Sequence, residues 1–309
     1  MVSNMRPDRA HPERGSFVRD EAAALRALPD VELELYEFPP GPRALLAAAG
    51  DLRRRYRRGG ARFDVVHAHF GLSAWPALAV PARVRALTMH GTDLVDLRTR
   101  LATRAVLGRI DLPAAVSAPL VERIPGRARA RAQVLPCGED TARFAPVERQ
   151  RARAELGLDE SRPFTLFPAD PSRPEKRHDL AVALAAAAGV ELRSLGGVDP
   201  ARVPLWVNAA SAVLVPSERE GFGLAVLEAL ACDVPVLATP VGIHAEALAG
   251  VEGTLCAPFE LASWRAALEP LLAGGGRRVE GRAAAARFSA GAMAERVRSA
   301  WESALAACG

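Results

Sequence analysis

Short apolar segments alternate with longer Ala- and Leu-rich segments along nearly the whole chain of 309 residues. Some of the short segments, such as 212–215, are apolar at every position, which is typical of strands buried on both faces of a parallel sheet. Strand–helix alternation of this kind predicts a doubly wound α/β fold. A chain of 309 residues is longer than a single hydrophobic core usually supports, so the length fits two such units.

The expected strands fall into two series separated by a stretch rich in Pro, Gly and charge. They are 31–38, 63–67, 86–90, 114–117 and 133–135, and then 164–168, 190–195, 212–215, 234–238 and 254–256. Expected helices include 17–28, 178–188, 223–232 and 261–273. We therefore expect a first domain over residues 1–136, a second over 137–290, and a final helix in 291–309 that packs back toward the first.

Composition excludes several classes of protein. No uncharged apolar run reaches the length of about 18 residues that a membrane span needs, and the N-terminus lacks a secretory apolar stretch. The four cysteines are isolated, without the spacing of a zinc motif or disulfide framework, so a cytoplasmic protein is expected. A net charge of +4 with 5% aromatic residues disfavours a dedicated nucleic-acid binder.

One basic residue stands apart from all the others. Of the 40 Lys and Arg residues only Lys176 is a lysine, in a chain whose Arg- and Ala-rich usage is typical of GC-rich coding. It lies in 164–180, FTLFPADPSRPEKRHDL, which predicts a strand, a Pro-rich turn and a helix. Arg173 and Lys176 flank the helix start, where cations and free amides suit a diphosphate. The alternative is that both are ordinary surface cations.

The most informative segment is 211–246, SAVLVPSEREGFGLAVLEALACDVPVLATPVGIHAE. An apolar strand leads through a polar loop to a helix that begins near Gly223, whose first free amides can bind an anion or hydroxyl. Glu220 lies in the loop and Glu228 eight residues later, about 12 Å along a helix. Two carboxylates so placed can accept hydrogen bonds from both ends of an elongated, phosphate-bridged ligand. The alternative is a capped helix with Glu228 on a solvated face, but its apolar neighbours disfavour that.

These residues resemble the signature of the retaining glycosyltransferases of family 4. The matching positions are Ser217, Glu220, Gly221, Phe222, Gly223, Leu227, Glu228, Ala229, Ala231, Pro235 and Val236. The resemblance implies the GT-B fold, in which two Rossmann-like, doubly wound domains face each other across a cleft. Family members often continue with a Gly-Gly pair, whereas here Gly242 is followed by Ile243.

The resemblance also implies roles for single residues. Glu220 would contact the transferred sugar, the amides of Phe222, Gly223 and Leu224 would bind sugar hydroxyls or phosphate, and Glu228 would hold the ribose. Lys176 and Arg173 would neutralise the leaving nucleotide, although many relatives place the Arg earlier, just after the strand.

The N-terminal half carries a weaker form of the same resemblance. Residues 3–25 are similar to the family's first loop and helix, in which Gly15 would face the donor phosphates. A strand normally precedes this loop, so the first domain is expected to lack part of it. His90, before Gly-x-Asp, matches the family's histidine that approaches the donor sugar from the acceptor side; His67 is expected to be buried, and His69 is left open. A metal site of three histidines would need both strands to converge, and no metal or cofactor is expected.

The chain is therefore expected to be a metal-independent, hexosyltransferase-type enzyme that moves a sugar from a nucleotide-diphosphate sugar to an acceptor hydroxyl with retention. The acceptor would be a cell-envelope glycan, a glycolipid or a natural product, bound by the first domain. The basic stretch 52–59 could touch anionic membrane headgroups or a phosphorylated acceptor, or present an ordinary solvated face. Alternatives are a GT-B nucleotide-sugar epimerase, or a non-catalytic subunit that binds nucleotide-sugars.

Overall fold

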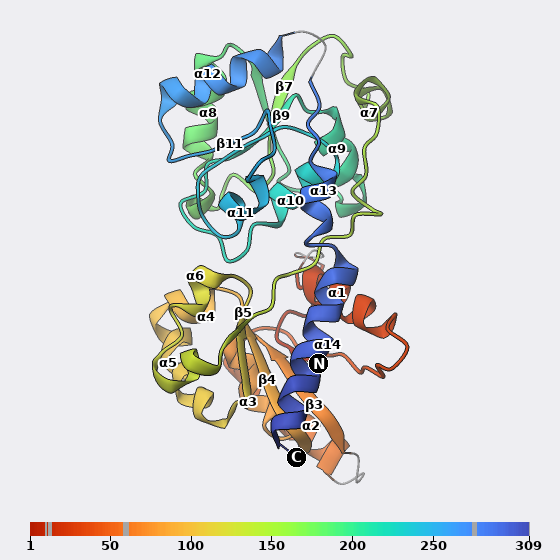
Figure 1. The fold of residues 1–309 in the computed structure, drawn as a ribbon, viewed down its shortest axis with the longest axis vertical. Coiled ribbons are helices and arrows are strands. Elements are labelled where there is room, and N and C mark those ends of the chain that lie inside the picture. Colours follow the sequence, from red (N-terminus) through yellow and green to blue (C-terminus); the bar gives the residue numbers. More distant parts are fainter. Residues whose placement is uncertain (10, 12–13, 58–61, 274–276, 309) are drawn as a thin grey trace. The chain divides into compact units, whose positions relative to one another are not determined.

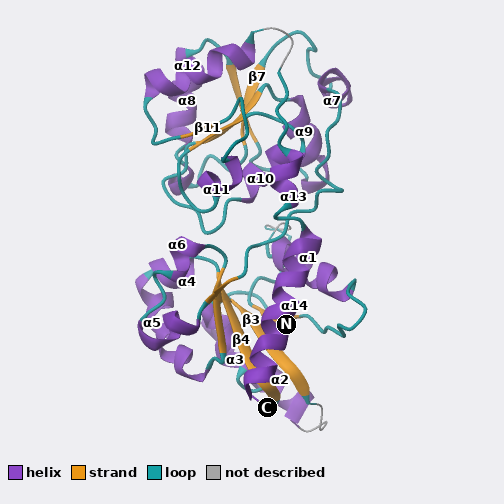
Figure 2. Cartoon of the chain, in the orientation of Figure 1, coloured by secondary structure: helices purple, strands orange, loops and turns teal. Residues whose placement is uncertain are grey.

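The computed structural model describes residues 1–9, 11, 14–57, 62–273 and 277–308. The chain divides into two compact units, one formed by Met1–Gly138 with Ala290–Gly309 and the other by Glu139–Ser289. The C-terminal helix thus belongs to the first unit, and the limits lie within two residues of the expected 136 and 290. Both units are parallel sheets with helices (Figure 2).

The sheet of the first unit has the strand order β2-β1-β3-β4-β5-β6, with every pair parallel. Its strands are β1 (Val2–Ser3), β2 (Tyr36–Glu37), β3 (Phe63–His69), β4 (Ala82–Met89), β5 (Leu112–Ala115) and β6 (Gln133–Val134). The inner position expected to be incomplete is occupied by the two residues of β1, which pair with both β2 and β3. Two residues are too few to produce a readable apolar pattern.

The helices of the first unit include α14, which the chain supplies after passing through the other unit (Figure 1). They are α1 (Ser16–Arg26), α2 (Pro42–Leu52), α3 (Gly71–Ala77), α4 (Thr92–Val95), α5 (Leu97–Val106), α6 (Ala118–Val121) and α14 (Ala290–Cys308). Met293 and Val297 of α14 are buried against Leu25 of α1 and Val84 of β4. This burial anchors the end of the chain to the first sheet.

The sheet of the second unit has the order β11-β10-β9-β7-β8. Its strands are β7 (Phe164–Phe167), β8 (Glu191–Ser194), β9 (Ala212–Val215), β10 (Val236–Ala238) and β11 (Leu255–Cys256). Its helices are α7 (Arg149–Leu156), α8 (His178–Ala187), α9 (Val203–Ala209), α10 (Leu224–Ala231), α11 (His244–Leu248), α12 (Leu261–Leu272) and α13 (Arg282–Ala286). All four residues of β9 are buried, as expected for a central strand covered on both faces. Trp264 and Leu268 of α12 complete the core beside Leu214 and Leu237.

Within the described part of the chain, no helix combines the length and the apolar character needed to span a bilayer.

Candidate active site

Three neighbouring strands of the second unit direct the polar residues of the site toward one edge of the sheet. β10, β9 and β7 lie side by side and are parallel, so their carboxyl ends meet at the same edge. The turn after β7 carries Lys176, the loop after β9 carries Ser217 and Glu220, and Thr239 follows β10. This topology explains how residues 44 positions apart come into contact.

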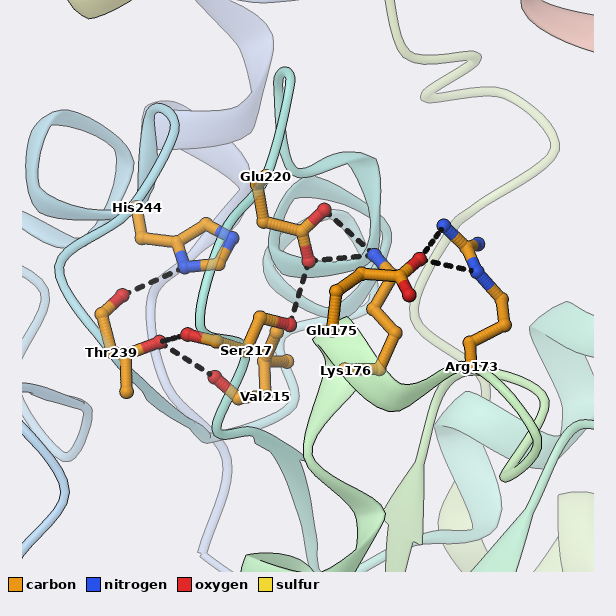
Figure 3. A network of polar contacts seen from close by, with 8 residues as sticks. All are labelled: Arg173, Glu175, Lys176, Val215, Ser217, Glu220, Thr239 and His244. Carbon is orange, nitrogen blue, oxygen red and sulfur yellow. Dashed lines mark hydrogen bonds and ion pairs between the residues drawn. The ribbon is translucent and has the colours of Figure 1, made fainter. Parts of the chain in front are cut away.

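Lys176 and Glu220 form the central ion pair of the site (Figure 3). The Lys176 Nζ donates to both carboxylate oxygens of Glu220, at 2.7 and 2.6 Å, and the Ser217 hydroxyl donates to Oε1 at 2.8 Å. The two charged side chains are only 15% and 9% exposed. Shielding of this kind strengthens a charge-assisted bond relative to a surface pair.

A cavity of about 10 Å³ lies beside this pair, lined by Lys176, Ser217, Glu220 and the apolar residues Phe167 and Ala225. That volume holds about one water molecule. A diphosphate is much larger, so binding one here requires the lysine to leave Glu220 or the loops to open.

The start of α10 presents its first amides next to the ion pair. Gly223 caps the helix with a φ of 116°, a conformation that favours glycine. A Cβ at this position would also lie 2.5 Å from the His244 Nε2. Phe222, just before the cap, is buried and packs edge-on against Phe288, and its carbonyl accepts from the Ile243 amide at 2.9 Å. The loop is thus held in place, while the amides at the very start of α10, before that of Val226, have no partner within the helix.

Glu228 lies within α10, and its carboxylate has no hydrogen-bond or ion-pair partner among the described residues. Burial raises the pKa of this carboxyl to about 7, although Arg143 and Lys176 favour its charged form. A half-buried acid without a partner is costly in the free protein. Such a carboxylate is suited to accept hydrogen bonds from hydroxyl groups of a ligand.

Arg173 does not join the central pair. Its guanidinium is about half exposed and donates to the Glu175 carboxylate, at 2.7 and 2.9 Å. Figure 3 shows Glu175 and Arg173 forming a separate pair beside Lys176. The sequence argument overlooked that an acid only two residues away competes for this arginine.

Two residues near the site, His244 and Arg143, were not predicted from the sequence. His244 is fully buried, and its Nδ1 bonds with the Thr239 carbonyl at 2.8 Å, which leaves Nε2 without a hydrogen-bond partner among the described atoms. Thr239 in turn donates to the Ser217 carbonyl at 2.5 Å (Figure 3). Arg143 affects Glu228 electrostatically. The one indication of His244 in the sequence was its position directly after Gly242-Ile243, where the family motif continues.

The first unit positions the remaining candidates. Gly15 precedes α1 and lies against Met5. His90 directly follows β4, is half-buried and contacts the rings of Phe17 and Phe70 at centroid distances of 4.9 and 4.5 Å. His67 is buried, as expected.

The strands that carry these histidines do converge, because β3 and β4 are adjacent. Ligand atoms of Glu21, His67 and His69 lie within 4.8 Å of one another, all buried. Among the described residues, this is the one group whose composition could suit a metal.

The basic stretch is partly neutralised within the first unit. Arg54 pairs with Asp51 at 3.3 Å and Arg55 with Glu34 at 3.4 Å. Residues 58 and 59 lie outside the described residues. Arg53, Arg54 and Arg55 are exposed, so their ion pairs hold them only weakly and they form a cationic surface.

Two family models match the two halves of the chain. The model described as Glycosyltransferase Family 4 matches residues 5–143, and that described as Glycosyl transferases group 1 matches residues 174–288. The second match contains Lys176, Glu220 and Glu228.

Curated relatives and solved structures agree with these matches. A D-inositol 3-phosphate glycosyltransferase of Xylanimonas cellulosilytica is 30% identical, over 97% of this chain and 87% of that protein. One from Pseudarthrobacter chlorophenolicus is 29% identical, over 93% and 79%. Sucrose-phosphate synthase of Thermosynechococcus elongatus has a TM-score of 0.71 at 20% identity, over 94% of this chain and 93% of that one. HepE of Anabaena, solved with UDP and glucose, has a TM-score of 0.64 at 17% identity, over 88% and 86%. The chain therefore belongs to glycosyltransferase family 4 and is a glycosyltransferase of the GT-B fold.

Proposed function

We propose that the second unit binds a nucleotide-diphosphate sugar and that the enzyme transfers its hexose to an acceptor hydroxyl with retention of configuration. The observation that carries this proposal is the Lys176–Glu220 pair beside the free amides of α10, with the unpartnered Glu228 in the same helix. A cation, free amides and two carboxylates match the phosphates, the sugar and the ribose of such a donor.

Each of these groups has a chemical task in this proposal. Lys176 transfers from Glu220 to the donor diphosphate, and Glu220 then accepts hydrogen bonds from the sugar. Glu228 accepts from the ribose, and the amides of Phe222, Gly223 and Leu224 bind sugar or phosphate oxygens. Arg173, which is half-exposed beside the turn, adds long-range positive potential rather than a direct contact.

The reaction breaks the bond between the anomeric carbon and the diphosphate oxygen as the acceptor oxygen bonds to that carbon on the same face. The proton of the acceptor hydroxyl passes to the leaving diphosphate. Negative charge grows on the leaving oxygen, where Lys176 and the dipole of α10 stabilise it. The ammonium of Lys176 and the oriented amides supply this stabilisation from the protein, and we propose that the enzyme needs no metal.

We assign the acceptor to the first unit, with His90 contacting the donor sugar and Gly15 lying close to its phosphates. Curated relatives are named D-inositol 3-phosphate glycosyltransferases, so phosphorylated cyclitols are the first acceptors to test. Glycans and glycolipids follow, and for a lipid acceptor Arg53, Arg54 and Arg55 would contact anionic headgroups from a cytoplasmic enzyme.

The test is a donor panel assayed in EDTA. The protein is incubated with UDP-, GDP- and ADP-hexoses, with and without inositol 3-phosphate, and released nucleoside diphosphate and glycosylated product are measured. One donor should give product that depends on acceptor. Release of nucleotide without any acceptor product would favour the epimerase or hydrolase alternative, and binding without release would favour a non-catalytic subunit.

A further inference from the structure

A line of three ionisable side chains runs from the interior of the first unit to His90. Glu21 extends from α1 and is buried, His69 ends β3 and is buried, and His90 follows β4 and is half-buried. The Glu21 Oε1 lies 3.4 Å from the His69 Nε2, and the His69 Nδ1 lies 3.1 Å from the His90 Nε2. At 3.4 Å the contact between Glu21 and His69 is an ion-pair approach and not a hydrogen bond, and neither the Glu21 Oε1 nor the His69 Nε2 has a hydrogen-bond partner among the described residues.

A bound metal does not explain this arrangement. Both nitrogens of His67 are already engaged, because the Trp301 indole donates to Nδ1 at 3.2 Å and Nε2 then donates to the Thr88 hydroxyl at 2.8 Å. The rings of His67 and His69 are also stacked, 4.8 Å apart at 27°. The lone pair of an imidazole nitrogen lies in the ring plane, so stacked rings do not aim theirs at one shared ion. What remains is the chain Glu21–His69–His90.

The 3.1 Å contact between His69 and His90 is a hydrogen bond, and a small approach of the Glu21 carboxyl to the His69 Nε2 would extend it into a chain that links the proton on Glu21 to the Nδ1 of His90. When Glu21 is ionised, the His69 Nε2–H donates to it and the His90 Nε2–H donates to the His69 Nδ1. The His90 Nδ1 is then an acceptor. When Glu21 is protonated, each donor reverses, so the His69 Nδ1–H donates to the His90 Nε2 and the His90 Nδ1 carries a proton.

We propose that Glu21 and His69 are positioning residues that form a proton relay and decide whether His90 presents a donor or an acceptor nitrogen to the sugar substrates. The relay balances. A proton from a hydroxyl bonds to the His90 Nδ1, the Nε2 proton of His90 passes to the His69 Nδ1, and the Nε2 proton of His69 passes to Glu21. The hydroxyl oxygen keeps its electron pair, and both imidazoles end neutral.

The electrostatics of the cluster agree with this relay. Burial raises the pKa of Glu21 to about 7 and lowers that of His69 to about 3. Burial, reinforced by His69, also holds the pKa of His90 well below its usual value. The imidazoles therefore stay neutral near pH 7, while the carboxyl titrates there.

Other charged groups face the cluster without joining the relay. His67 and the N-terminal amino group act on Glu21 through space. Asp93 of α4 accepts from the backbone amides of His90 and Gly91, not from the imidazole. Its pKa is raised to about 6 by burial, so it needs its own control.

The experiment observes the tautomer of His90 directly. Protein labelled with ¹⁵N-histidine is titrated from pH 5.5 to 8.5, and two-bond ¹H–¹⁵N spectra report which ring nitrogen carries hydrogen; His90→Gln assigns the signal. In the wild type, His90 should change from Nδ1–H to Nε2–H as the pH rises, with a midpoint near 7. Glu21→Gln should abolish the pH dependence, whereas the exposed Glu32→Gln and the backbone-bonding Asp93→Asn should keep it.

Three outcomes would overturn the relay. They are a wild-type His90 whose tautomer does not change with pH, a His90 that is doubly protonated between pH 5.5 and 8.5, and the same tautomer change persisting in Glu21→Gln. Stoichiometric zinc lost on Glu21→Gln would also overturn it. If Glu21→Gln does not fold, the wild-type titration and the variant His69→Asn test the relay, because His69→Asn should also abolish the pH-dependent tautomer change of His90.

The role of the relay in catalysis rests on the proposed function, but this readout does not. An intact tautomer change combined with full transfer activity in His90→Gln would leave the relay standing and refute only the role of His90 in transfer.

Discussion

Replacing Glu228 by Gln should stabilise the ligand-free protein above neutral pH while weakening its binding of nucleotide. The carboxylate has no polar partner among the described residues, and burial raises its pKa from 4.5 to about 7. A raised pKa means that the folded state disfavours the charged form. The penalty is absent below about pH 4.5, where the acid is protonated in both states, and is complete above about pH 7.

The size of the effect follows from the shift. A rise in pKa of about 2.5 units corresponds to at most about 3 kcal/mol of lost folding free energy. Water near this half-buried carboxylate reduces that penalty to about 1–3 kcal/mol. For a unit of this size that is a rise in Tm of about 2–10 °C at pH 8. Loss of a charged hydrogen bond to the ribose should weaken nucleotide affinity by about 10- to 100-fold.

The assay is a thermal melt at pH 5 and pH 8, together with calorimetric titration of nucleoside diphosphates. Glu252→Gln, an exposed acid of the same unit, is the matched control and should change neither quantity. A Tm change of equal size at both pH values would refute the buried-charge argument. Unchanged nucleotide affinity would refute the ribose contact.

Further substitutions separate the roles of the other site residues. Lys176→Met should lower kcat/KM by about 10- to 150-fold. It should also destabilise the fold, because Glu220 is left without its cation. Adding Glu220→Gln should restore the Tm but not the turnover, so a double variant with restored turnover would contradict the role of Lys176. Gly223→Ala should cost about 1–3 kcal/mol in a denaturant titration, because of its positive φ and the close His244 Nε2; a loss under 0.5 kcal/mol would show that His244 moves aside. Arg173→Ala should change stability by less than about 0.5 kcal/mol, since its pair is exposed, and should reduce kcat/KM far less than Lys176→Met; equal losses would place the arginine on the phosphate.

Most of the fold could be predicted because the strands of both sheets are short, mostly apolar segments that alternate with helical ones, and the central strand β9 is apolar at every position. The expected strand 212–215 coincides with β9, and the others overlap β2–β8, β10 and β11 with ends that differ by a few residues. Only β1 was not predicted, because two residues are too few to show an apolar pattern. The pairing of Val2 with both Tyr36 and Ala68 depends on contacts far away in sequence.

The site was predictable where composition or spacing made a residue unusual. Lys176 stood out as the only lysine, and Glu220 and Glu228 through their loop and apolar helix. Arg173 was placed less well because local pairing with Glu175 is invisible to a motif.

The interior polar residues could not be found from the sequence. Glu21 lies in a helix of ordinary composition, and only the pairing of β3 with β4 brings His69 beside His90. Asn208 is buried and bonds to the backbone of Val147, Ala145 and Pro204, which is a structural role.

The most direct test of the donor site is calorimetric binding of UDP, GDP and ADP in EDTA to the wild type, Lys176→Met and Glu228→Gln. We predict that at least one nucleotide binds the wild type without a divalent cation and binds each variant at least 10-fold more weakly. If none of the three nucleotides binds, or if both variants bind as tightly as the wild type, a donor site that contains Lys176 and Glu228 is contradicted.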